Sequence, residues 1–63
     1  MGPVPYYHFF FLDLKDAVAH RGGAHFASDK QAIERAEKLH SIGGIEVWQG
    51  ARFVGKVEPI TER

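Results

Sequence analysis

The longest apolar run of the chain lies near its start, and it is apolar on both of its alternating sides. Five of the six residues from Tyr6 to Phe11 are tyrosine or phenylalanine. Aromatic residues are enriched in strands, where successive side chains point to opposite faces. The run therefore predicts a strand over residues 6–14, about nine residues long, that ends in the polar stretch from Asp13 to Asp16.

Residues 28–44 carry the pattern of a single helix. Ser28 and Gln31 have the spacing of a capping box, in which each side chain bonds the backbone amide of the other residue. Gly43-Gly44 supplies the glycine that commonly follows a helix, so a helix of about fifteen residues is predicted. Phe26 stands just before it and is expected to anchor its start to the core. The apolar residues that recur at helical spacing are Ala32, Ile33, Ala36, Leu39 and Ile42.

Residues 45–57 predict a β-hairpin, with Gly50 in the turn as the residue that accepts a positive φ. Residues 17–20 predict a short second strand that returns antiparallel to the first. The stretch Arg21-Gly22-Gly23 is expected to end that strand, because two adjacent glycines loosen the backbone.

The order strand, strand, helix, strand, strand predicts one small α+β domain over residues 1–63. We expect a three- or four-stranded, mainly antiparallel sheet with one helix packed on one face. Residues 1–5 form a proline-containing leader, and residues 59–63, from Pro59 on, are expected to fray. To the face under the helix we assign Phe10, Leu12, Leu14, Trp48, Phe53 and Val57. To the outer face we assign Tyr7, Phe9, Phe11, Ile45, Val47 and Val54, fringed by Asp13, Arg52 and Lys56.

The small size of the chain makes an uncovered apolar face important. A chain of 63 residues buries only about 60% of the surface of its unfolded form, and without cysteine it has no disulfides. Oligomerisation or docking is the remaining source of stability. We therefore expect a non-catalytic protein–protein interaction domain, either a homo-oligomer or an accessory subunit of a larger complex. The expected interface is the outer sheet face or an exposed edge of the sheet, and its residues are Tyr7, Phe9, Phe11, Val47, Arg52 and Val54. In the alternative, the first strand is covered by its own leader and by residues 15–25.

Charge and hydropathy narrow the classes of partner. Eight basic and eight acidic residues give a formal net charge of zero, which does not favour nucleic acid. A nucleic-acid-binding regulator that uses the sheet aromatics with Arg52 and Lys56 stays as the alternative function. The first apolar run is much shorter than the roughly 20 residues of a membrane span, and it lacks the features of a signal peptide. A cytoplasmic protein with no membrane partner is expected.

The sequence contains no residue pattern typical of a catalytic site. The four histidines lack the His-x-x-x-His spacing of a zinc site, and the carboxylates are scattered over predicted turns and solvated faces. There is no cysteine nucleophile and no nucleophile elbow, and neither glycine pair forms a phosphate-binding loop. We predict no catalytic residue, metal, cofactor or small-molecule substrate, while a small subunit of an enzyme stays open.

Residues 10–16 and residues 45–54 together resemble a family of very small bacterial proteins of rhizobial type, a domain of unknown function. Residues 10–16, Phe-Phe-Leu-Asp-Leu-Lys-Asp, are similar to its Tyr-Phe-Phe-Asp-hydrophobic-Arg-Asp opening. Residues 45–54 are similar to its Ile-Glu-Val-Trp-Asp-Gly-x-Arg-Leu-Val ending. Gln49 replaces the usual aspartate, and residues 20–23 replace an acidic Asp-Glu-x-Gly. The resemblance covers most of residues 8–58; it implies a fold and a bacterial source, and it carries over no catalytic or binding residues.

Overall fold

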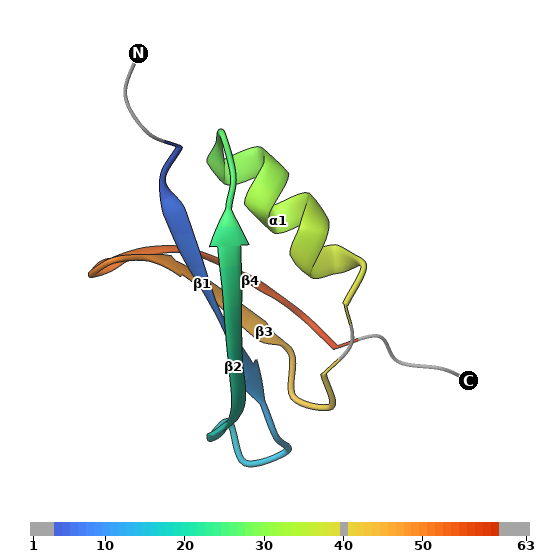
Figure 1. The fold of residues 1–63 in the computed structure, drawn as a ribbon. Coiled ribbons are helices and arrows are strands. Elements are labelled where there is room, and N and C mark those ends of the chain that lie inside the picture. Colours follow the sequence, from blue (N-terminus) through green and yellow to red (C-terminus); the bar gives the residue numbers. More distant parts are fainter. Residues whose placement is uncertain (1–3, 40, 60–63) are drawn as a thin grey trace.

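Four strands and one helix follow one another in the order that the sequence predicts (Figure 1). The computed structural model describes residues 4–39 and 41–59. Neighbouring strands are all antiparallel and form one sheet in the order β2-β1-β3-β4. The predicted α+β class is therefore confirmed. The elements are β1 (Tyr6–Leu12), β2 (Val18–His25), α1 (Asp29–Glu37), β3 (Ile45–Gln49) and β4 (Arg52–Val57).

Helix α1 begins where the capping box predicts, and one of its two bonds is displaced. The amide of Gln31 donates to Ser28 Oγ at 3.2 Å. In the other direction Gln31 Oε1 accepts from the amide of Ala27, not of Ser28, also at 3.2 Å. The start of the helix is thus fixed by local side-chain bonds.

The helix ends earlier than predicted, at Glu37 after nine residues. The reason is that the following segment returns to the end of β1. The Ser41 hydroxyl and the Gly43 amide both donate to the carbonyl of Leu12, at 2.6 and 2.8 Å. Gly44 has a φ of 98° and accepts from the Leu12 amide at 2.9 Å. A longer helix would carry these residues away from β1. His40 lies outside the described residues.

The prediction that the glycine pair ends the second strand is wrong. Strand β2 continues through Arg21-Gly22-Gly23 to His25. A β-carbon on Gly23 would overlap the carbonyl oxygen of Tyr7 and the hydroxyl of Tyr6. Glycine in a strand often marks such a close approach. The glycine is therefore needed here to let β1 and β2 come together.

The core lies between α1 and one side of the sheet, and it corrects the predicted assignment of faces. Tyr7 and Phe9 are 2% and 3% exposed and cluster with Ala32 and Ala36 of α1. Phe26 stacks on Phe9 with ring centres 5.8 Å apart, so its predicted role as an anchor is confirmed. The helix covers the face that was expected to be outer. Packed at the margin of this core are Phe11, Ile33, Leu39, Val54 and Val57.

A bulge in the hairpin explains why Val57 lies on the helix side, as predicted, although Trp48 and Phe53 lie on the other side. The register pairs Trp48 with Phe53 but Val47 with Gly55, so β4 has one extra residue between these pairs. A one-residue shift moves every later side chain to the other face. Val57 therefore pairs with Ile45 on the covered face, and Lys56 pairs with Glu46 on the other.

No helix in the described part of the chain has the length and apolarity needed to cross a bilayer. Of residues 59–63, which are expected to fray, residues 60–63 lie outside the described residues, as do residues 1–3 of the leader.

Candidate interaction surface

The side of the sheet opposite α1 carries the second set of aromatic residues, and we call it the open face. Strand alternation places Tyr6, His8 and Phe10 of β1 on this side, because Tyr7 and Phe9 point into the core. The register adds Trp48, which pairs with His8, and Phe53, which pairs with Trp48. The open face therefore carries aromatic rings from three neighbouring strands, β1, β3 and β4.

The rings of the open face contact one another in two groups. The Tyr6 ring meets those of His8 and His25 edge-on, each with centres 5.0 Å apart. His8 also stacks on Phe10 at 6.2 Å. On the neighbouring strands β3 and β4, the rings of Trp48 and Phe53 form an edge-to-face pair with centres 5.3 Å apart. Because His8 and Trp48 are direct cross-strand partners, the two groups form one aromatic band.

This band is accessible to solvent. Tyr6 is 41% and Phe53 50% exposed, whereas Tyr7 and Phe9, on the other side, are almost fully buried. His8 is exposed, and Phe10 and Trp48 are partly exposed. Such an aromatic patch on a small protein is typical of a surface that meets another molecule.

Charges of both signs lie within the band. The register places Arg21 beside Phe10 and Lys56 beside Glu46. Glu46 accepts a hydrogen bond from the indole Nε1 of Trp48 at 3.1 Å, which fixes the orientation of the ring. Lys56 Nζ lies 3.9 Å from an Asp16 carboxylate oxygen. The open face thus combines aromatic surface with the cations Arg21 and Lys56 and the carboxylate of Glu46, and a second carboxylate, that of Asp16, lies beside Lys56.

The residues expected at the interface lie on the helix side of the sheet instead, so that prediction is wrong. Tyr7, Phe9 and Val47 are buried, and Phe11 and Val54 are partly buried against the same core. Alternation alone could not choose between the faces, because β1 is aromatic on both. The remaining predicted interface residue, Arg52, is bonded to the start of α1.

Arg52 belongs to a cluster that joins three parts of the fold. The Tyr7 hydroxyl donates to Asp29 Oδ1 at 2.6 Å. Arg52 reaches both carboxylate oxygens of Asp29, at 2.9 and 3.1 Å, and its Nη2 and Nε also donate to Gln49 Oε1, Nη2 at 2.6 Å. The cluster therefore ties β1, the first turn of α1 and the β3–β4 hairpin together.

The hydrogen bonds of the cluster shift the pKa values of its three titratable groups. Hydrogen bonds from Arg52, and then from Tyr7, lower the pKa of Asp29 from 3.8 to about 2. The bond to Asp29, together with burial, raises the pKa of the Tyr7 hydroxyl above 10.0. The pKa of Arg52 is also raised by Asp29. At neutral pH the cluster is one carboxylate held between a phenol and a guanidinium. Sequence reasoning missed this cluster, because Asp29 lies far from both Tyr7 and Arg52 along the chain, although an acidic residue one position after an N-cap is visible in the sequence.

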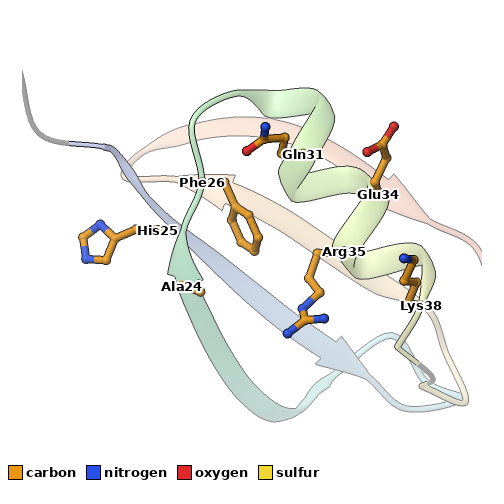
Figure 2. A pocket seen from close by; sticks show the side chains of 7 residues that line it. All are labelled: Ala24, His25, Phe26, Gln31, Glu34, Arg35 and Lys38. Carbon is orange, nitrogen blue, oxygen red and sulfur yellow. The ribbon is translucent and has the colours of Figure 1, made fainter.

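A groove of about 470 Å³ separates the end of β2 from α1. Phe26 projects into it between the two elements, and Arg35 extends from the helix toward β2, while His25 points away (Figure 2). The groove exists because α1 packs mainly over β3 and β4. Its lining residues are Ala24, His25, Phe26, Gln31, Glu34, Arg35 and Lys38.

The described histidines contact backbone carbonyls and aromatic rings. His25 Nδ1 lies 2.9 Å from the carbonyl of Val4, and His20 meets the Phe11 ring edge-on at 5.8 Å. Among residues 4–39 and 41–59, no three histidine, aspartate or glutamate side chains gather as a metal site would require.

No family model, curated protein or solved structure matches this chain. The resemblance to the small bacterial family therefore stays a prediction, and function has to be inferred from the surfaces described above.

Proposed function

We propose that this protein is a non-catalytic protein–protein interaction domain that assembles with a second copy of itself through the open face. The observation that carries the proposal is the aromatic band of Tyr6, His8, Phe10, Trp48 and Phe53, which no helix covers. Such rings each bury about 150 to 250 Å² when they are enclosed. A partner on this face would provide the cover that the single helix gives to the other.

Area and charge both favour a second copy as the partner. A standard interface buries about 800 Å² on each partner. The whole chain has 4602 Å² of accessible surface, so one broad side of this two-layer domain can supply that area. The chain has no net charge to oppose self-association. The open face holds Arg21, Lys56 and Glu46, so a copy related by a two-fold axis can offer opposite charges.

The oligomeric state tests this proposal directly. Light scattering during size-exclusion chromatography should give the mass of an oligomer, and dilution should shift the emission of Trp48, the one tryptophan of the chain. Phe53→Glu should weaken the assembly about tenfold or more, as expected for an aromatic residue near an interface centre. Leu14→Glu is the matched control, because Leu14 is 76% exposed and lies in the β1–β2 turn.

Two outcomes would count against self-assembly. A monomer at every concentration would reject it and leave the accessory-subunit form, in which a different protein covers the open face. Equal weakening by Leu14→Glu and Phe53→Glu would show that the open face is not the contact. We expect the assembly to act in the cytoplasm, as the sequence predicts.

Single-stranded nucleic acid is the second candidate for the open face. It is favoured by one observation: two cations, Arg21 and Lys56, lie on the same side of the sheet as the aromatic rings. Bases stack on aromatic side chains of a sheet while cations hold the backbone. Arg52, which the sequence suggested for this role, is bonded to Asp29 on the opposite side.

A single-stranded oligonucleotide should then quench Trp48, with an affinity that falls steeply as salt rises. Lys56→Glu should weaken binding, whereas Lys15→Glu, in the β1–β2 turn, should leave it unchanged. Absent or salt-independent quenching would reject this candidate.

A further inference from the structure

Strand β2 is the least protected strand of the sheet. All of its eight residues are exposed, α1 packs mainly over β3 and β4, and within the described part of the chain β2 borders only β1. Unpaired edge strands are usually guarded by proline, lysine, bulges or a cover. The opposite edge, β4, has Lys56, Arg52 and a bulge. β2 contains neither proline nor lysine, and its own bulge, at Ala19, lies before Arg21, so the edge from Arg21 to His25 is open to another strand.

The β1–β2 ladder shows which backbone groups of β2 are free. The amide of Phe26 donates to the carbonyl of Pro5 at 3.1 Å. In an antiparallel pair every second residue bonds the neighbouring strand, so Gly22 and Ala24 face β1. The amides and carbonyls of Arg21, Gly23 and His25 therefore point away from the sheet. They offer a regular row of donors and acceptors to an added strand.

The charges around β2 select the kind of strand that fits. β2 has no acidic residue, and Arg21 has no ion-pair partner in the described part of the chain. On the helix side, Arg35 and Lys38 line the groove beside β2 and also have no ion-pair partner among residues 4–39 and 41–59. Glu34 is the one carboxylate among the lining residues. An added strand would meet cations on both of its faces.

We infer that β2 binds an extended acidic segment of another protein as a fifth strand of the sheet. Backbone hydrogen bonds to Arg21, Gly23 and His25 provide the pairing. Acidic side chains on one face of the segment meet Arg35 and Lys38 across the groove, and those on the other face meet Arg21. This site goes beyond the proposed self-assembly, because it uses the edge of the sheet and not the open face.

The test is a fluorescence anisotropy titration with a fluorescein-labelled peptide as long as β2, made of glutamate and valine with glutamates on both faces. We expect the peptide to bind, a lysine version to fail, and a version with every backbone nitrogen methylated to fail as well. Methylation keeps the charge and removes the backbone donors. Arg35→Glu with Lys38→Glu should weaken binding at least about fivefold. Lys15→Glu with Lys30→Glu makes the same change in net charge away from the groove and should have little effect.

Three results would overturn the inference. They are no binding of the acidic peptide to the folded protein, equal binding of the methylated peptide, and equal weakening by the control pair of substitutions. Binding of a single-stranded oligonucleotide that the Arg35→Glu, Lys38→Glu protein loses equally would show a general polyanion site and would also overturn it. The Phe53→Glu protein should bind the peptide like the unsubstituted chain, which separates this test from that of the open face.

Discussion

The two sides of β1 carry similar side chains but differ in burial. Tyr7 and Phe9 lie under α1 and are almost fully buried, whereas Tyr6 and His8 lie on the open face and are exposed. Aromatic residues on both sides of one strand show that composition does not decide which side becomes core. The difference lies in what covers each side, and here one helix and Phe26 cover only one. The predictions below test how different the two sides are.

The largest expected effect comes from removing a ring on each side. Phe9→Ala should destabilise the fold by about 3–5 kcal/mol, because it leaves a cavity in the core, and a domain of this size has little more than that to lose. Phe53→Ala should cost less, about 1–2 kcal/mol, because the ring is already 50% exposed and loses mainly its edge-to-face contact with Trp48. Urea unfolding followed by circular dichroism measures both. Equal losses would mean that the open face is part of the core.

The glycine pair of β2 gives a second matched comparison. A β-carbon on Gly23 would overlap the Tyr7 carbonyl, whereas one on Gly22 would lie 3.5 Å from Phe11 Cε1, an ordinary contact. Gly23→Ala should therefore cost about 1–3 kcal/mol through forced displacement, and Gly22→Ala should change little. Thermal unfolding of the two variants distinguishes them. A stable Gly23→Ala protein would contradict the close approach of β1 and β2.

The two tyrosines of β1 differ in the same way at their hydroxyls. Tyr7→Phe removes the donor to Asp29 and should lower the unfolding midpoint, by less than Phe9→Ala does. Tyr6→Phe is its counterpart on the open face and should have a smaller effect. If both substitutions changed the midpoint equally, the Tyr7–Asp29 bond would contribute nothing specific.

The smallest effect concerns acid stability. The pKa of Asp29 is lowered from 3.8 to about 2 in the folded state, so the folded protein binds fewer protons than the unfolded chain. The stabilisation is complete above the unfolded pKa and is lost as the pH falls from about 4 through about 2. Asp29→Asn should flatten the pH dependence of the unfolding midpoint in that window. An unchanged slope would show that Asp29 is not the group responsible.

Local patterns were sufficient for part of the structure. The start of α1, the β3–β4 hairpin, the anchoring by Phe26 and the order of elements follow from caps, turns and periodicity that act over a few residues. The end of the helix did not follow, because Ser41 and Gly43 bond to Leu12, far away in the sequence. The length of β2 could not be predicted either, because glycine is needed at position 23 to make room for Tyr6 and Tyr7 of the neighbouring strand.

The sequence by itself determined that one apolar side of the sheet would lack a helix, since it encodes a single helix and a strand that is aromatic on both faces. Only the tertiary structure decided which side that is. β2 and β3 both run antiparallel to β1 and are joined by α1, so the helix is a crossover between parallel strands. Such crossovers have a nearly fixed hand, so the covered side of β1 depends on which of its edges β2 pairs with. That choice rests on long-range strand pairing, which no local pattern of residues records.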